Sequence, residues 1–324
     1  MNQKLFKKLE QTICTDYGNT VGLVIQPNNA KPYEHYFNGY TASDAVHVFS
    51  VTKSIISLLI GIAAAKGCLK TDQKVLDFFP DYTVLPGEHT IQNITVAHLL
   101  TMTAPYKYET EPYEKFFESP NPIRDALDLL GGDNPIGRFN YAAIGGSQIL
   151  SGILARATGQ PVLAFAQEHL FSALDIYVPC SIEIHSREEH FAVMNNKNTC
   201  GWTVDPQGNN TAGWGLFLRP ADMAKIGALA LNRGIWNGRQ IVPADWISES
   251  TSRHSRCAQW GDLDYGYLWW LIDSDSFAAM GDGGNVIYVN TKKQLVISIA
   301  SLFVPDAKDR IQLIKEQIEP LVDE

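Results

Sequence analysis

Several features that would assign a protein class are absent from this 324-residue sequence. No cluster of Lys and Arg interrupts a chain of net charge −9, so neither nucleic acid nor an anionic membrane surface is an expected partner. The strongly apolar run between Lys53 and Lys66 has only 12 residues, too few to span a bilayer. The N-terminus shows no long apolar stretch of the kind found in secretion signals, so we expect a cytoplasmic location.

Cysteine is scarce, and no residue pattern typical of a metal or cofactor site appears. The five cysteines, an odd number without a Cys-x-x-Cys pair, are explained most simply as free thiols in a reducing compartment. His185 and His190, with Glu188 and Glu189 between them, lack the His-Glu-x-x-His spacing of a zinc helix. We expect that stretch to be a solvated polar loop, and we expect neither a metal nor a cofactor.

The remaining composition, 45% hydrophobic and 19% charged, is that of an ordinary globular protein of one large domain or two lobes. Strand patterns occur near both ends of the chain, at Val21–Ile25, Tyr33–Tyr40, Tyr265–Leu271, Asn285–Val289 and Leu295–Ile299. Helical patterns begin at the N-terminus, where Leu5, Phe6, Leu9 and Ile13 form one stripe, and recur at Val96–Met102, Gln148–Ala157, Leu163–Phe171, Ala221–Leu231 and Asp306–Ile318.

This order of elements favours an antiparallel sheet built by both ends of the chain. We predict an α+β fold, with a sheet domain over residues 1–70 and 205–324 and an inserted, mainly helical domain over residues 71–204. Residues 104–122, rich in Tyr, Glu and Pro, are expected to form a long ordered loop, and such loops inside domains are often functional.

The most informative motif is Ser50-Val51-Thr52-Lys53, which opens the apolar run. On a helix, residues i and i+3 share a face, so the hydroxyl and the amine are neighbours at the first turn. A lysine whose pKa burial lowers can take the proton of a serine nucleophile, and a helix N-terminus favours a developing anion. The motif alone is equally compatible with a capping serine and a solvated lysine.

Two further segments hold candidate partners. Tyr141, in Phe139-Asn140-Tyr141, can relay protons beside a lysine, although a single tyrosine is more often a core residue. Glycines in the segment 280–285 allow close approach of a strand edge, where a backbone N–H can complete an oxyanion hole with that of Ser50. A plain hairpin turn is the alternative interpretation of that segment.

Taken in order, the motifs resemble those of the serine β-lactamase and penicillin-binding-protein family. They are Ser50-Val51-Thr52-Lys53, His98-Leu99-Leu100-Thr101-Met102, Phe139-Asn140-Tyr141, 152–161, Gly215–Ala224, Tyr265–Trp270 and Gly281-Asp282-Gly283-Gly284. The similarity covers about residues 20–300 and is greatest to the class C-like branch of esterases and 6-aminohexanoate-oligomer hydrolases. It implies a β-lactamase/transpeptidase-like fold, with an antiparallel sheet flanked by helices, an inserted helical domain, and the active site between the two domains.

The resemblance also implies roles for particular residues. Ser50 corresponds to the acylated nucleophile, Lys53 to its general base and Tyr141 to the tyrosine that assists proton transfer. The oxyanion hole would consist of the backbone N–H groups of Ser50 and Asp282. Gly281 and Gly283 would lie beside the substrate.

Two departures from the family pattern narrow the substrate. Ala143 replaces the Asn of Tyr-x-Asn, and Ala279 replaces the basic residue of Lys-Thr-Gly, which in penicillin-recognising members helps bind a carboxylate. Such a contact contributes a few kcal/mol, or roughly a hundredfold in binding. Its loss, and the like charge of Asp282, argue against β-lactams and D-Ala-D-Ala peptides.

The sequence thus favours a serine hydrolase that acts through an acyl-enzyme on a small ester or amide. A β-lactamase or D-amino-acid peptidase, and a non-catalytic sensor of the same fold, are the alternatives. Trp214 is equally compatible with a substrate wall and with core packing. Of Tyr106, Tyr108 and Tyr113 the sequence does not say which reaches the substrate, and we expect His98 to be structural.

Overall fold

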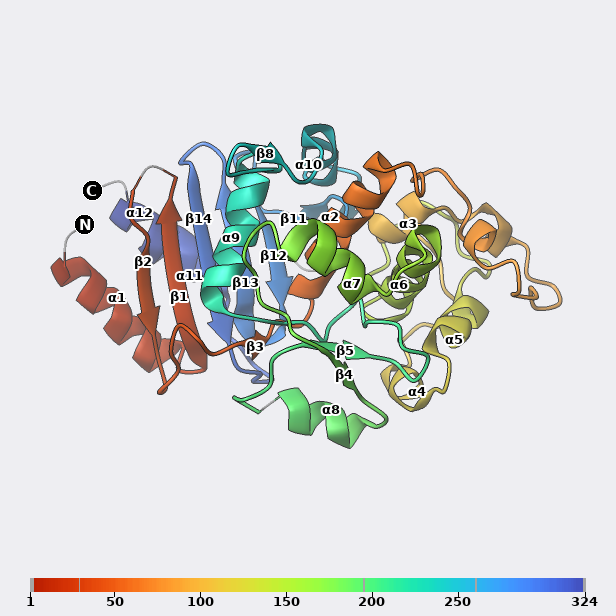
Figure 1. Ribbon diagram of the computed structural model, residues 1–324, viewed down its shortest axis with the longest axis horizontal. Coiled ribbons are helices and arrows are strands. Elements are labelled where there is room, and N and C mark those ends of the chain that lie inside the picture. The colour runs from red at the N-terminus through yellow and green to blue at the C-terminus, as the bar shows by residue number, and fades with distance from the viewer. Residues whose placement is uncertain (1–2, 29, 195, 260, 323–324) are drawn as a thin grey trace.

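An eight-stranded antiparallel sheet runs through the described part of the molecule, which comprises residues 3–28, 30–194, 196–259 and 261–322 of a computed structural model (Figure 1). From one edge to the other its strands are β2 (Tyr33–Tyr36), β1 (Thr20–Pro27), β14 (Leu295–Ser301), β13 (Asn285–Asn290), β12 (Ser276–Gly281), β11 (Trp270–Leu271), β10 (Leu263–Tyr265) and β9 (Ser255–Cys257). Strands from both ends of the chain thus meet at the centre, where β1 pairs with β14, and this confirms the predicted α+β fold.

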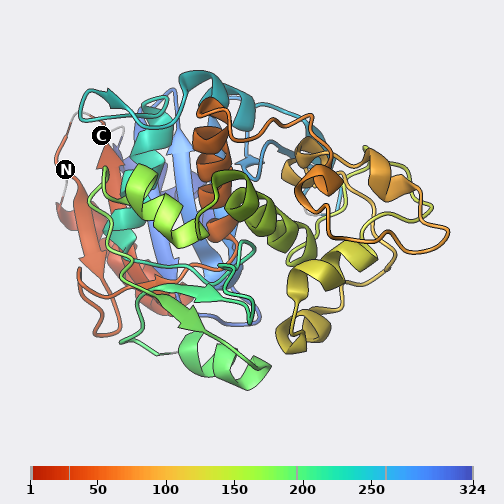
Figure 2. The same ribbon diagram turned by 45° about the vertical axis from the view of Figure 1, so that its right-hand side comes forward.

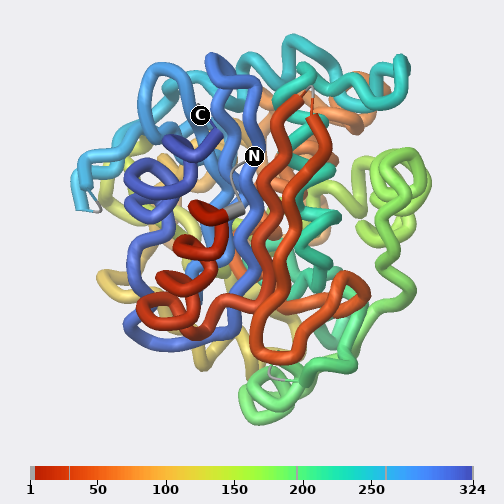
Figure 3. Tube along the Cα trace, turned by 90° about the vertical axis from the view of Figure 1, so that its left-hand side faces the viewer, coloured from red at the N-terminus to blue at the C-terminus, as the bar shows by residue number. Residues whose placement is uncertain are grey.

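Both faces of the sheet are buried, because apolar side chains alternate along its central strands. In β14, Leu295, Ile297 and Ile299 face one apolar cluster, and Val296 and Ala300 face the other. The first cluster is covered by α1 (Gln3–Asp16) and the C-terminal helical segments, α11 (Arg310–Leu313), η5 (Ile314–Ile318) and α12 (Glu319–Val322), which lie side by side in Figure 3. The second is covered by α9 (Pro220–Leu231) and α2 (Val51–Ala65).

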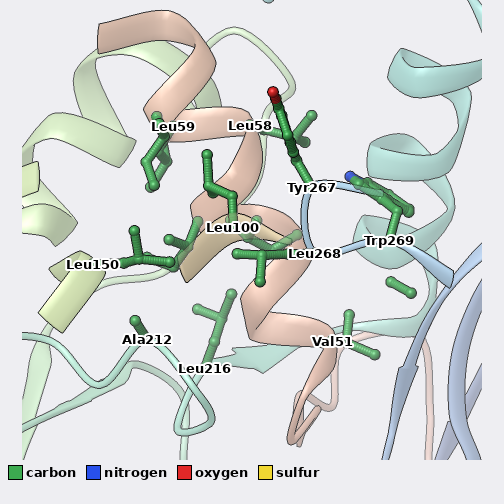
Figure 4. Packing of buried hydrophobic residues seen from close by; sticks show 14 of the residues in the cluster. Val51, Leu58, Leu59, Leu100, Leu150, Ala212, Leu216, Tyr267, Leu268 and Trp269 are labelled. Carbon is green, nitrogen blue, oxygen red and sulfur yellow. The ribbon is translucent and has the colours of Figure 1, made fainter. Parts of the chain in front are cut away.

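Helix α2 is the helix that the apolar run predicts, and it is buried from Val51 to Ala63. It packs on β12 and β13 on one side and on α6 (Gly145–Thr158) on the other. Figure 4 shows Leu59, Leu100 and Leu268 in the core around it, which explains why the helix has no polar face. The first turn, where the nucleophile motif lies, is therefore held rigidly between the sheet and the helical region.

Most of the helical region lies beyond α2 and away from the sheet, whereas its last helical segment, residues 162–171, lies in front of the sheet beside α9 (Figure 2). It contains η1 (Val75–Phe78), η2 (Thr90–Asn93), α3 (Val96–Leu100), α4 (Tyr113–Glu118), α5 (Pro122–Leu129), α6, α7 (Val162–Ala166) and η3 (Gln167–Phe171). No single helix among the described residues is long and apolar enough to cross a membrane, although α6 and 162–171 meet that criterion as a bent pair. The domain boundaries at residues 70 and 204 stay predictions.

Short elements complete the chain around the N-terminal end of α2. They are β3 (Val46–His47), which pairs with β6 (Phe217–Leu218), β4 (Ser181–Glu183), which pairs in parallel with β5 (Trp202–Val204), α8 (Arg187–Met194), β7 (Ile235–Trp236), β8 (Arg239–Gln240), α10 (Ala244–Ser250) and η4 (Asp282–Gly284). The pairing of β3 with β6 brings the segment before Ser50 next to the segment that follows Trp214.

The sequence prediction was wrong at three places. Tyr265–Leu271 is not one strand, because Leu268 adopts a φ of +61° and turns the chain back between β10 and β11. Its N–H donates to the Leu100 carbonyl, and its own carbonyl accepts from the Ser54 hydroxyl at 2.6 Å, so contacts with distant elements decide this turn. The expected loop at 104–122 contains α4, and the expected polar loop at 185–190 runs into helix α8.

Replacing Leu59 by Ala should destabilise the protein by about 2–5 kcal/mol, because it removes a fully buried side chain from a helix packed on several sides. The exposed Leu85 provides the matched control, and Leu85→Ala should change stability by less than about 0.5 kcal/mol. Urea denaturation of both variants measures the two values. Equal losses would show that α2 is not the centre of the core.

Candidate active site

The chain enters α2 through a strained and anchored turn. Phe49 has a φ of +50°, in the left-handed region that a residue with a side chain seldom adopts, and Ser50 follows as the N-cap of α2. The ring of His47 lies behind this turn, with Nε2 3.1 Å from the Gly215 N and Nδ1 3.3 Å from the Phe49 N. A neutral imidazole accepts only one of these N–H groups, and the shorter contact is the one with Gly215. Backbone strain at the residue before a candidate nucleophile is common at functional sites.

Lys53 is the best-placed partner of Ser50. Its Nζ lies 2.8 Å from the Ser50 Oγ and 2.8 Å from the Gly213 carbonyl oxygen, and the side chain is 2% exposed. A neutral amine can donate one N–H to that carbonyl while its lone pair accepts the serine proton. The buried lysine and the serine therefore meet in the arrangement that the helical spacing predicts.

Burial lowers the pKa of Lys53 from 10.5 to about 8, because the charged form loses its hydration. The carboxylates of Glu111 and Asp282 act in the opposite direction and stabilise the ammonium. The amine is therefore neutral in an appreciable fraction of molecules near neutral pH, as a general base requires.

Tyr141 completes the group. Its ring centroid lies 5.2 Å from Lys53 Nζ and stacks on Trp270 at 5.8 Å. Burial raises the pKa of its hydroxyl above 10, and a hydrogen bond with Ser50 partly offsets that rise. The phenol consequently stays protonated and is a hydrogen-bond donor rather than a base.

The end of β12 lies against the N-terminus of α2. A Cβ on Gly281 would come within 2.3 Å of the Val48 carbonyl oxygen and 3.1 Å of the Ser50 N, so only glycine fits there. Gly283 has a φ of +75° and leaves no room for a side chain beside the Leu302 carbonyl. Gly281 is thus the position where the strand edge approaches the serine, and it lines the cavity over Ser50. Gly283 packs against Leu302 instead and does not line that cavity, in contrast to the expectation that it lies beside the substrate. The oxyanion role of the Ser50 and Asp282 N–H groups stays a prediction.

A cavity of about 940 Å³ opens over Ser50. Its lining is mainly apolar and rich in aromatic side chains, namely Phe49, Tyr113, Phe117, Tyr141, Phe191, Trp214, Trp270 and Phe303. The half-buried Trp214 lines it, which favours the substrate-wall interpretation over core packing. Tyr113 is the loop tyrosine that lines the cavity, whereas Tyr106 is buried.

The charged side chains of the cavity are mostly paired. Arg187 bonds to Glu114 at 2.7 Å, and Lys115 lies 3.4 Å from Asp125. Asp282 has no ion-pair partner among the described residues. The unpaired charge on the side of the cavity that Asp282 lines is therefore negative.

Glu111 is a functional residue that the sequence prediction missed. Its carboxylate is 8% exposed and accepts the backbone N–H groups of Ala143, Ile144 and Gly145 at 2.7, 3.0 and 2.7 Å. A carboxylate at the N-terminus of α6 satisfies donors that the helix itself leaves unpaired. Glu111 therefore holds the segment that carries Tyr141. In the sequence, the only sign of a functional role for the region around Glu111 was the unusual composition of residues 104–122.

The structure also shows where the two histidines without a predicted catalytic role, His98 and His190, lie. His98 is structural, as expected, because its Nδ1 accepts the Thr95 N–H at 3.0 Å at the start of α3. His190 contradicts the expectation of a solvated loop, since it lies on α8, is 7% exposed and lines the cavity. Ala143 lines the cavity and Ala279 is fully buried in β12.

The geometry agrees with comparisons of the whole sequence, since the sequence profile named Beta-lactamase matches residues 10–318. The chain belongs to the β-lactamase family. A 6-aminohexanoate-dimer hydrolase of Paenarthrobacter ureafaciens is 21% identical in an alignment of 327 positions that covers 94% of this chain and 76% of the relative. The match confirms the predicted serine β-lactamase and penicillin-binding-protein family.

Two solved structures of β-lactamase-family character share the fold. One is the octameric penicillin-binding protein homologue from Pyrococcus abyssi, with a TM-score of 0.73, 19% identity, and coverage of 99% of this chain and 77% of that one. The other is a family VIII carboxylesterase, with a TM-score of 0.67, 15% identity, and coverage of 97% of both chains. At these identities the likeness shows the fold, and the chain is a hydrolase of β-lactamase fold by family.

The charge environment predicts how Lys53 titrates. Lys53 should lose its proton as the pH rises through about 8, and Asp282→Asn should shift this transition to lower pH because it removes a carboxylate that stabilises the ammonium. Nuclear magnetic resonance of the lysine Cε, assigned with Lys53→Met, follows the titration. Glu114→Gln is the control and should leave it unchanged, and a Lys53 transition near 10.5 would refute the argument.

Glu111→Ala should destabilise the protein by about 2 kcal/mol or more, because three backbone N–H groups lose a charged acceptor. Glu114→Ala removes a neighbouring carboxylate that is 73% exposed and should cost less than about 1 kcal/mol. Urea denaturation compares the two. Similar losses for both variants would show that Glu111 does not hold the Tyr141 segment.

Proposed function

We propose that the protein is a serine hydrolase that forms an acyl-enzyme on a small ester or amide. The observation that carries the proposal is the 2.8 Å contact between the Ser50 Oγ and the buried amine of Lys53, whose pKa is about 8. The names of the relatives, a 6-aminohexanoate-dimer hydrolase and a carboxylesterase, support acyl-transfer chemistry on this fold.

The mechanism begins with the neutral form of Lys53, which takes the Ser50 proton as Oγ attacks the carbonyl carbon. The negative charge on the carbonyl oxygen is stabilised by the N–H groups of Ser50 and Asp282 at the end of β12. As the tetrahedral intermediate collapses, Tyr141 passes a proton to the leaving alcohol or amine and recovers one from Lys53. Water then attacks the acyl-enzyme by the reverse proton path and frees Ser50.

The cavity indicates what kind of acyl compound fits. Its walls are mainly apolar and rich in aromatic rings, and its two flanking cations, Lys115 and Arg187, are paired. Asp282 adds a carboxylate that has no ion-pair partner among the described residues. A substrate carboxylate at that side would meet like charge without a compensating cation. The charge of the cavity therefore supports a neutral small ester or amide as the substrate over a penicillin or a D-Ala-D-Ala peptide. A non-catalytic sensor is disfavoured for another reason, because it would not require Ser50, Lys53 and Tyr141 together. We also propose that the protein is located in the cytoplasm.

Ser50→Ala should reduce hydrolysis of p-nitrophenyl acetate and butyrate by about four to six orders of magnitude. Ser54→Ala is the matched control, since its hydroxyl lies on the same helix and bonds to the Leu268 carbonyl instead of facing the cavity. The change is read as kcat/KM. Substantial hydrolysis by Ser50→Ala would remove the nucleophile assignment.

The same assay separates the competing functions. Turnover of the esters without hydrolysis of benzylpenicillin supports the proposal. Rapid penicillin hydrolysis would instead favour a β-lactamase, and the absence of any turnover or labelling by an acylating probe would favour a sensor.

A further inference from the structure

Among the described residues, His190 is a wall residue of the cavity with a buried ring nitrogen, Nδ1, that has no assigned use. It is 7% exposed, its Nδ1 is inaccessible to solvent, and neither ring nitrogen has a hydrogen-bond partner among the described residues. Either neutral tautomer therefore leaves an N–H or a lone pair unsatisfied at the buried Nδ1, whereas Nε2 is not enclosed in this way. Buried polar groups are hydrogen-bonded in the great majority of cases, so the exception requires an explanation.

A structural role does not explain it. A histidine that serves the fold normally bonds to the backbone, as His98 does through Thr95 and His47 does through Gly215. His190 contributes only ring contacts, which phenylalanine would supply without the cost of an unpaired polar group. The described residues also contain no group of three or more ligating side chains that would make it a metal ligand.

The ring lies in an aromatic wall that begins next to the catalytic group. His190 packs edge-on against Trp214 with centroids 4.3 Å apart and is stacked on Phe117 at 5.0 Å. Trp214 directly follows Gly213, whose carbonyl holds the Lys53 amine. A substrate bonded to Ser50 would therefore extend along this wall within the same cavity.

The imidazole offers a neutral contact rather than a charge. Burial lowers its pKa to about 4, so the ring is uncharged at neutral pH. The titratable groups nearest to it are uncharged or paired, since His47 lies 5.4 Å away with a pKa held far below its usual value, and Arg187 on the same helix bonds to Glu114. A neutral donor or acceptor such as a hydroxyl or an amide matches this environment better than a carboxylate.

We infer that His190, Phe117 and Trp214 form a substrate subsite, here called the His190 subsite, for a flat apolar group that carries a hydroxyl or amide hydrogen-bonded to the imidazole. The inference rests on the proposed function and makes His190 a specificity-determining residue. A phenol-like ring would stack in the aromatic wall while its hydroxyl forms a hydrogen bond with Nε2, the ring nitrogen of His190 that is not enclosed.

Binding of 4-ethylphenol and ethylbenzene tests the subsite, because the two probes differ only in the hydroxyl. We expect the wild-type protein to bind 4-ethylphenol about three- to tenfold more tightly, the range that one hydrogen bond between neutral groups provides. His190→Phe should abolish this preference. His185→Phe, a substitution of an exposed histidine that precedes the same helix, should retain it. Affinities come from titrations of intrinsic tryptophan fluorescence.

Two further measurements keep the outcomes distinct. His190→Phe should melt at the same temperature as the wild type or higher, since it removes an unsatisfied polar group, and a lower melting temperature would indicate a structural role and overturn the inference. In the wild-type protein labelled with 15N-histidine, 4-ethylphenol should shift the His190 ring resonances. This measurement does not depend on whether a variant folds. Equal binding of the two probes, or an unchanged preference in His190→Phe, would also overturn it.

The same probes bound to Ser50→Ala separate this inference from the proposed function. A hydroxyl preference in a protein that hydrolyses no ester would leave the subsite standing and remove the hydrolase proposal. Ester turnover by the wild-type protein without a preference for 4-ethylphenol over ethylbenzene would support the hydrolase proposal and remove the His190 subsite.

Discussion

The burial of one lysine amine against a serine hydroxyl is the constraint on which the site depends. Lys53 is 2% exposed at the start of a helix buried on all sides, and its Nζ has only the Ser50 Oγ and the Gly213 carbonyl as hydrogen-bond partners among the described residues. Taking an ammonium out of water is unfavourable, so the amine is neutral more readily than a free lysine. The core that stabilises α2 thus also produces the base that the proposed chemistry requires.

The rest of the site is arranged around this pair by segments that approach from different parts of the chain. The end of β12 reaches the Ser50 N because Gly281 has no side chain, and His47 ties the turn before Ser50 to the strand after Trp214. Glu111 fixes the segment that carries Tyr141 and, with Asp282, keeps the field around Lys53 negative. These acidic groups moderate the depression of the lysine pKa, so that the amine titrates near neutrality and not far below it.

Local patterns in the sequence predicted what depends on local chemistry. The apolar run after Ser50 predicted helix α2, and the strand patterns near both ends of the chain predicted an antiparallel sheet. The spacing of Ser50 and Lys53 predicted that their side chains meet. The failures share a physical cause, which is contact between distant segments. Glu111 bonds 32 to 34 residues away, and the turn at Leu268 is set by a contact with Leu100 and Ser54. His190 looked solvated because its neighbours are charged, yet aromatic rings from two other segments bury it.

The most direct test of the central claim is the site of covalent modification by a fluorophosphonate, located by mass spectrometry of proteolytic peptides. If Ser50 is the nucleophile and Lys53 its base, the adduct lies on Ser50, and labelling becomes much slower when Lys53 is replaced by Met. An adduct on another residue in a protein that hydrolyses esters, or equally fast labelling of Ser50 without the Lys53 amine, would contradict the account.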